Sequence, residues 1–132
     1  MSFIQPEWPA PERVRSLLTT RAGGISVSPY DTLNLGDHVG DQPAHVMANR
    51  QILGKCLPSE PIWLKQTHSV QVSTPISRAQ SAGKPFEADA AVTNIPNEVL
   101  AIMTADCLLC MTSCCMQDIA CTHKYQSSVD DD

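Results

Sequence analysis

The chain has 132 residues and a formal net charge of −5; 42% of its residues are hydrophobic and 17% are charged. This length suits one domain, and the composition favours a folded core over a disordered chain. The acidic balance argues against a nucleic-acid partner. No apolar run reaches the ~18 residues of a membrane span, and the first residues lack the pattern of a signal peptide, so we expect a cytoplasmic protein with no membrane partner.

The first half of the chain predicts one strand, a long irregular segment and one helix. Residues 14–20 are β-branched or apolar between turn formers, which is typical of a strand. Residues 21–40 contain four of the six glycines and predict turns. Asp41 is the expected cap of a helix that has Pro43 in its first turn. Apolar residues seven and four positions apart carry this helix to about Leu57, before Pro58.

The second half predicts short strands over residues 62–65, 70–73, 90–93, 99–104, 108–112 and 119–122. The polar segment 77–86 predicts a loop. One helix among six or seven strands indicates an α+β fold. We expect one domain over residues 1–123 and a disordered, acidic tail over residues 124–132.

The six cysteines are unevenly distributed, and only Cys56 lies outside the window 107–121. In a reducing cytosol this crowding does not indicate a disulfide framework. Cys107 and Cys110 have the spacing of half a zinc knuckle, but no second such pair follows. A structural zinc site with four cysteines is therefore disfavoured.

Three residues, His68, Cys107 and His123, each follow an apolar or β-branched run. A His, a Cys and a His at strand ends make up the ligand set of a catalytic zinc with one open position. The alternative is that each is a packed core residue, which is commoner for a single His or Cys. Asp106 would disfavour a free Cys107 thiolate, whereas bound zinc deprotonates the thiol; Asp106 then orients a ligand or acts as a base, or simply caps a turn.

Two glycine-punctuated loops are candidates for substrate binding. Arg21 precedes Gly23 and Gly24, and glycines allow successive backbone N–H groups to converge on a phosphate or carboxylate. Asn34 begins a second loop of this kind. The alternative for both is a plain turn, with a solvated arginine in the first.

The chain resembles the YfiH family, also called the peptidoglycan editing factor, laccase-domain or purine nucleoside phosphorylase family. The similar segments, in order, are Thr20-Arg21-Ala22-Gly23-Gly24-Ile25-Ser26, Tyr30-Asp31-Thr32-Leu33-Asn34-Leu35-Gly36, Gly40-Asp41, Asn49-Arg50, Trp63-Leu64-Lys65-Gln66-Thr67-His68, Ala88-Asp89-Ala90 and Thr104-Ala105-Asp106-Cys107-Leu108. The resemblance implies one α+β domain with mixed sheets and a zinc held by His, Cys and His. It also implies phosphorolysis of adenosine, inosine, guanosine or methylthioadenosine, and deamination of adenosine.

Residue by residue, the resemblance assigns His68 and Cys107 to the first two zinc ligands and Arg21 to the active-site loop. Two departures stand out. Leu109 replaces a proline, and His123, the expected third ligand, is followed by Lys124 and Tyr125 instead of Ala-Gly-Trp-Arg-Gly. Family members are also about twice as long, so the pattern fits a truncated or frame-shifted copy.

The resemblance implies a zinc-dependent purine nucleoside phosphorylase with adenosine deaminase activity, whose substrates are a purine nucleoside and phosphate. The expected site residues are Arg21, Asp106 and Cys107 for catalysis, Arg21, Gly23, Gly24 and Asn34 for substrate binding, and His68, Cys107 and His123 for zinc. One alternative is a remnant or binding protein without catalysis. Others are a Cys–His hydrolase with Cys107 as nucleophile, and a phenol-oxidising copper enzyme, which would want more histidines than the four present.

Overall fold

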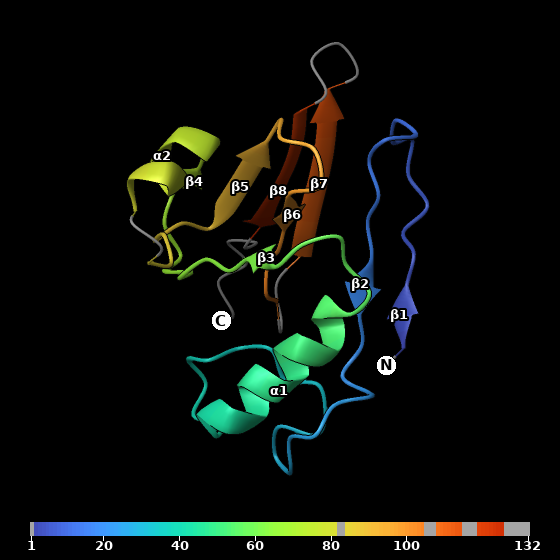
Figure 1. The fold of residues 1–132 in the computed structure, drawn as a ribbon, viewed down its shortest axis with the longest axis vertical. Coiled ribbons are helices and arrows are strands. Elements are labelled where there is room, and N and C mark those ends of the chain that lie inside the picture. Colours follow the sequence, from blue (N-terminus) through green and yellow to red (C-terminus); the bar gives the residue numbers. More distant parts are fainter. Residues whose placement is uncertain (1, 82–83, 105–107, 115–118, 126–132) are drawn as a thin grey trace, which may run out of the picture. The chain divides into compact units, whose positions relative to one another are not determined.

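The computed structural model describes residues 2–81, 84–104, 108–114 and 119–125, the last two segments by their backbone alone. The chain divides into two compact units, Met1–Pro58 and Ser59–Asp132 (Figure 1). Among the described residues, none of the helices has the length and apolar character needed to cross a membrane.

The first unit begins with a two-stranded antiparallel ribbon. β1 (Phe3–Ile4) pairs with β2 (Leu18–Thr19). The strand predicted over residues 14–20 is wrong outside β2, because β1 offers a partner to only two residues. The Val14 N–H instead donates to the Pro11 carbonyl at 2.9 Å, which closes a turn.

The irregular segment predicted over residues 21–40 is confirmed, and it is followed by α1 (Pro43–Gly54). The N-cap is Gln42, without a side-chain hydrogen bond, so the predicted Asp41 cap is wrong. The Asp41 carboxylate is engaged by the Ser26 hydroxyl and the Asn34 amide instead. The helix ends three residues before Leu57, whose N–H bonds the Gly54 carbonyl in a tighter i to i−3 turn.

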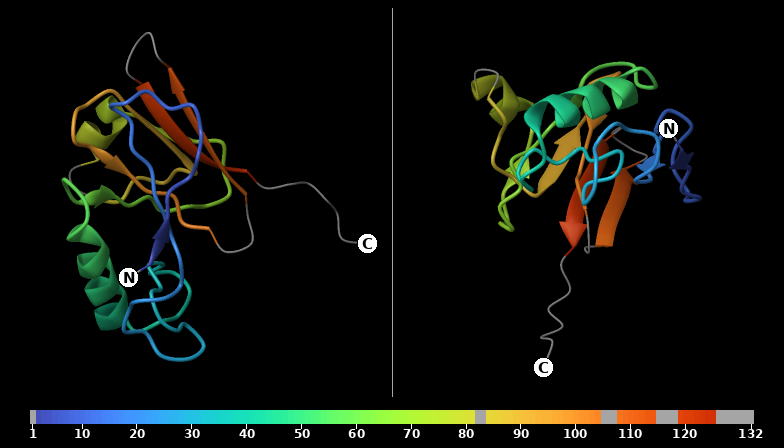
Figure 2. Two further views of the ribbon diagram at one scale, coloured as in Figure 1. Left: turned by 90° about the vertical axis from the view of Figure 1, so that its right-hand side faces the viewer. Right: turned by 90° about the horizontal axis from the view of Figure 1, so that it is seen from below.

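α1 buries Val46, Asn49 and Leu53, which share one face. The Asn49 side chain is fully buried. Its Oδ1 accepts the Ile25 N–H at 2.9 Å, and its Nδ2 donates to Ser26 Oγ and to the Asn34 carbonyl, each at 2.8 Å. The Asn49 side chain thus bonds the irregular segment to α1, and the two lie side by side (Figure 2).

The second unit contains a four-stranded mixed sheet in the order β4-β5-β8-β7. β4 (Val72–Ser73) runs parallel to β5 (Ala90–Thr93), whereas β8 (Ile119–Tyr125) is antiparallel to both β5 and β7 (Leu108–Cys114). A separate parallel pair joins β3 (Pro61–Ile62) to β6 (Val99–Leu100).

The core of this unit forms around three buried residues, Leu64, Ala88 and Ala91. Ile62, Phe86, Leu100 and Ile102 pack against them. In the described part of the chain, mixed sheets with two helices confirm the predicted α+β class. β8 extends two residues past the predicted domain boundary at 123. Residues 126–132 of the expected tail lie outside the described residues, and the boundary stays a prediction.

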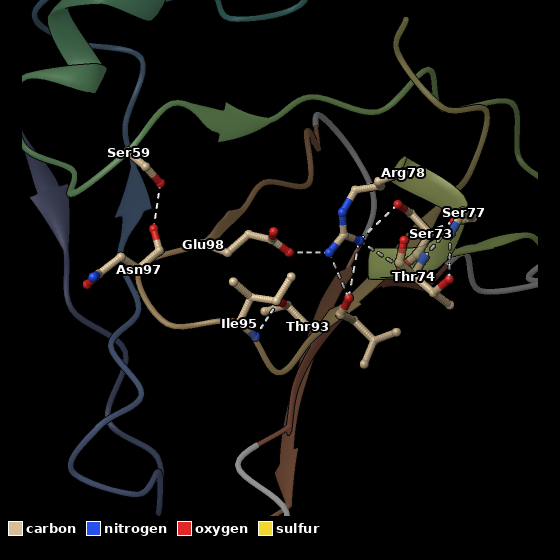
Figure 3. A network of polar contacts seen from close by, with 10 residues as sticks. Ser59, Ser73, Thr74, Ser77, Arg78, Thr93, Ile95, Asn97 and Glu98 are labelled. Carbon is tan, nitrogen blue, oxygen red and sulfur yellow. Dashed lines mark hydrogen bonds and ion pairs between the residues drawn. The ribbon is translucent and has the colours of Figure 1, made fainter. Parts of the chain in front are cut away.

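A second helix, α2 (Pro75–Gln80), replaces the start of the loop predicted over residues 77–86. Thr74 caps it: Thr74 Oγ1 accepts the Ser77 N–H, and the Ser77 hydroxyl oxygen accepts the Thr74 N–H. Arg78 then reaches from the helix to the Ser73 and Val92 carbonyls and to the Glu98 carboxylate (Figure 3). Capping and this tertiary anchor explain a helix too short to be stable alone.

Candidate functional site

The turn that carries His68 is held by one buried carboxylate. The Asp89 side chain accepts the backbone N–H groups of Thr67 at 3.2 Å, His68 at 3.1 Å and Ser69 at 2.7 Å. The Ser69 hydroxyl adds a fourth contact at 3.1 Å. His68 itself has a φ of 57°, a left-handed conformation unusual for a non-glycine residue. Three successive N–H groups therefore converge on Asp89.

The charge state of Asp89 follows from two opposing effects. Burial raises the pKa of this carboxyl group, whereas the hydrogen bonds from the Ser69, Thr67 and His68 N–H groups and the Ser69 hydroxyl lower it. The net result is a pKa below the ordinary aspartate value. Asp89 is consequently ionised at neutral pH, which strengthens its hold on the turn.

A second anchor lies two residues before His68. The Gln66 Nε2 donates to the Met103 carbonyl at 2.9 Å, and the Gln66 Oε1 accepts the Met103 N–H at 2.8 Å. This two-bond pairing fixes the approach to His68 beside residue 103. Cys107 follows Met103 by four positions in the sequence and lies outside the described residues.

His123 enters the same neighbourhood through the sheet register. On β8 it is the Cα partner of Ala90 on β5 and of Cys110 on β7. Ala90 directly follows Asp89, the residue that holds the His68 turn. The His68 segment is thus bonded to Met103 through Gln66 and to Asp89, which directly precedes the β5 residue that pairs with His123.

The N–H groups of Gly23 and Gly24 converge as the sequence predicts. The acceptor that they share is the Thr32 side chain rather than a bound anion. The Gly23 and Gly24 N–H groups donate to Thr32 Oγ1 at 3.1 and 3.2 Å. That hydroxyl donates in turn to the Arg21 carbonyl at 3.0 Å. These two donors serve the loop itself in this structure, while the Arg21 side chain is exposed. Phosphate binding at Arg21 stays a prediction.

Asn34 is also engaged within its own loop. Its Oδ1 accepts the Gly36 N–H at 3.1 Å, and its Nδ2 donates to the Gly36 carbonyl and to the Asp41 carboxylate. Asn34 and Asp41 help to hold the second glycine-punctuated loop against α1. Contact of Asn34 with a substrate stays a prediction.

The proposed metal ligands are only partly described. Asp106 and Cys107 lie outside the described residues, as does the His123 side chain. Within the part that is described, His, Cys, Asp and Glu side chains nowhere gather in a group of three that could hold a metal. The His68, Cys107 and His123 set therefore stays a prediction.

Sequence reasoning missed Gln66 and Asp89 as anchors. Asp89 carried a signal, since it is a charged residue inside the otherwise small and apolar run 88–92, and charged residues inside such runs are paired. Gln66 carried no signal beyond its place in the motif that ends at His68. Its partner Met103 is 37 residues away.

Comparison with known proteins gives consistent matches. A family model described as multi-copper polyphenol oxidoreductase laccase matches residues 15–124. A Haemophilus influenzae protein named purine nucleoside phosphorylase is 44% identical over 126 residues, which cover 93% of this chain and 50% of that protein. The Escherichia coli purine nucleoside phosphorylase YfiH is 46% identical over 111 residues, covering 80% of this chain and 43% of that protein.

Among solved structures, protein NMB0706 of Neisseria meningitidis superposes with a TM-score of 0.81 at 38% identity, covering 92% of this chain and 49% of that one. The chain thus spans about half the length of the curated relatives it matches. The family model covers most of the chain, and the relatives and the fold agree with it. The chain therefore belongs to the laccase-domain family that includes YfiH.

Proposed function

We propose that this chain carries the active-site half of a zinc-dependent purine nucleoside phosphorylase that also deaminates adenosine. The names of the relatives in Haemophilus influenzae and Escherichia coli support the phosphorylase part. The observation that carries the proposal is the joining of three chain segments. Gln66 binds Met103, Asp89 binds the His68 turn, and Ala90 pairs with His123.

The donor chemistry of these segments fits zinc. Two imidazoles and a thiolate leave one of four tetrahedral positions for water or substrate, as in catalytic zinc sites. His68, Cys107 and His123 would be the ligands, and the fixed backbone at His68 suits a ligand whose place must be set before the metal binds. When bound, zinc would supply Lewis-acid activation of water for the deamination.

For phosphorolysis, Arg21 is the proposed phosphate-binding group. Its guanidinium is always charged and donates two parallel hydrogen bonds, which suits phosphate oxygens. A phosphate oxygen would form a bond to C1′ of the ribose as the bond from C1′ to the purine nitrogen breaks. The electron pair leaves with the purine, which takes up a proton, and ribose 1-phosphate remains. Asp106 would hold or pass that proton as a general acid–base.

Three rival functions remain distinct in their chemistry. A remnant or binding protein would release no product, and a Cys–His hydrolase would release free ribose without needing phosphate. A copper enzyme that oxidises phenols is the third rival, and the description of the matching family model favours it over the other two. Each rival predicts a different set of products.

The test is product analysis with the full 132-residue chain. Zinc-loaded protein is incubated with adenosine, with and without phosphate, and the purines and sugars are separated by chromatography. The proposal predicts adenine and ribose 1-phosphate only when phosphate is present, and inosine with or without phosphate, because deamination consumes water rather than phosphate. His68→Ala should abolish both activities, while His38→Ala, at an exposed histidine of the other unit, should retain them.

Adenine without phosphate would favour the hydrolase. Copper-dependent phenol oxidation would favour the oxidase, and no product from folded protein would contradict the proposal.

A further inference from the structure

We propose that Asp89 is the positioning residue of the zinc site. Its carboxylate holds the His68 turn, and Asp89 directly precedes β5, the strand that pairs with the His123 strand β8. The inference rests on the proposed function only for the identity of the ligands. Asp89 is not itself a ligand in this account. Its role is to set where His68 stands before a metal arrives.

The first step of the argument is the conformation of His68. The left-handed region is disfavoured for a non-glycine residue, so surrounding contacts must hold His68 there. The contacts present are the N–H bonds of Thr67, His68 and Ser69 to Asp89. Successive N–H groups turned to one side normally make a binding place for an anion. In this protein the anion is a side chain of the same chain.

The second step is that the two carboxylate oxygens of Asp89 accept hydrogen bonds from different donors. Asp89 Oδ2 accepts the Thr67 N–H, the Ser69 N–H and the Ser69 hydroxyl, whereas Oδ1 accepts the His68 N–H. Both oxygens are needed to hold the whole turn. The Asp89 side chain therefore cannot be replaced by an amide without losing contacts.

The third step places Asp89 between the two histidine segments. The backbone around it is bonded to both sides of the turn, since the Ala88 N–H donates to the Lys65 carbonyl and the Asp89 N–H to the Gln71 carbonyl. The next residue, Ala90, lies opposite His123 on β8. A shift of Asp89 would move the His68 turn relative to the His123 strand.

The experiment compares the zinc affinity of Asp89→Asn with that of the unchanged full chain, by competition with a chromophoric chelator. The asparagine amide has one acceptor oxygen, and its NH₂ would face N–H donors. Losing the support of a metal ligand typically costs 10–100-fold in metal affinity, so we expect the zinc Kd to rise about tenfold or more. Ser69→Ala removes one of the four contacts and should raise the zinc Kd about threefold.

The matched control is Glu98→Gln, which weakens the largely shielded pairing with Arg78 in the same unit, away from the His68 turn. It should lower the melting temperature and leave the zinc Kd unchanged. If Glu98→Gln weakens zinc binding as much as Asp89→Asn, the effect is general destabilisation and the inference is wrong. Circular dichroism checks folding, and if Asp89→Asn does not fold, an unchanged zinc Kd in Ser69→Ala overturns the inference.

The outcomes also separate this inference from the proposed function. A wild-type chain that binds zinc but releases no adenine contradicts the function, while weaker zinc binding in Asp89→Asn still supports the role of Asp89. Active wild-type protein with full zinc affinity in Asp89→Asn contradicts the inference alone. A wild-type chain that binds no zinc contradicts both.

Discussion

Gly24 occupies a position where no side chain fits. A Cβ atom there would lie 2.2 Å from the Thr32 carbonyl oxygen and 2.5 Å from the Leu33 Cα, both backbone atoms that cannot rotate away. The close approach lets the next residue, Ile25, donate its N–H to Asn49. The glycine pair therefore shapes the loop that carries Arg21.

Gly24→Ala should lower the free energy of unfolding by about 3 kcal/mol, the upper end for inserting an atom into a packed site. Gly54→Ala is the matched control, because a Cβ at Gly54 meets nothing within 4 Å and alanine is the better helix former. That change should be neutral or raise the stability by up to about 1 kcal/mol. Urea unfolding measures both, and equal stability of the two variants would refute this explanation of Gly24.

At the scale of single residues, the sequence predicts where backbone N–H groups converge, but it does not predict which acceptor they bind. Gly23 and Gly24 do gather their N–H groups as expected, yet the acceptor is Thr32, nine residues from Gly23. Likewise His68 stands out by its motif, whereas its partner Asp89 lies 21 residues away. Local spacing identifies donors, and only the fold supplies their partners.

At the scale of elements, α2 is fixed to the sheet through one side chain. The Arg78 guanidinium donates to the Ser73 carbonyl and hydroxyl at 3.1 and 3.0 Å and to the Val92 carbonyl at 3.2 Å, and it pairs with Glu98. Arg78 and Glu98 are 12% and 20% exposed, so this ion pair is largely shielded from water. It joins the helix to the segment that leads into β6 (Figure 3).

Arg78→Met should lower the free energy of unfolding by about 3 kcal/mol or more, since Glu98 would keep a charge without its partner. Lys65→Met is the control. Lys65 and Glu87 are also paired, at 3.5 Å, but they are 66% and 64% exposed and the pair is screened by water. Its loss should cost less than about 1 kcal/mol. Thermal or urea unfolding of the two variants checks the difference, and similar losses would contradict it.

The predicted elements succeed where the chain's own pattern determines them. β5 has the bounds expected from its sequence, and the irregular segment 21–40 contains neither helix nor strand. α2 was missed because a polar six-residue helix depends on the Thr74 cap and the Arg78 anchor. The end of α1 at Gly54 was placed three residues late because apolar spacing continues past the last helical hydrogen bond.

At the scale of the whole molecule, an aspartate with a lowered pKa lies in each unit among the residues that the structure describes, Asp41 in the first and Asp89 in the second. The hydrogen bond from the Ser26 hydroxyl is the largest cause at Asp41. Burial opposes it there, and Asn34, the Gln42 N–H and the nearby His45 lower the pKa further. At Asp89 burial raises the pKa, but the bonds from the His68 turn outweigh it. Both carboxylates therefore stabilise the folded chain in their charged form.

Acid should consequently weaken both units. A carboxyl group with a lower pKa in the folded state contributes its full stability above the unfolded value of about 3.9 and loses it as the pH falls through the folded value. The free energy of unfolding should be steady near pH 7 and decline below about pH 5. Asp41→Asn and Asp89→Asn should each be less stable at pH 7 and show a shallower decline. Unfolding curves from pH 7 to 3 check this, and stability that rises on acidification would contradict it.

The arrangement that matters most for function involves segments far apart in the sequence. If His68, Cys107 and His123 bind one zinc, removing any of them should remove that zinc. Cysteines near the site could bind zinc nonspecifically, so the measurement is zinc content per chain in single variants. The account predicts the loss of one equivalent in His68→Ala, Cys107→Ala and His123→Ala, and none in Cys114→Ala. Unchanged zinc in His68→Ala would contradict it.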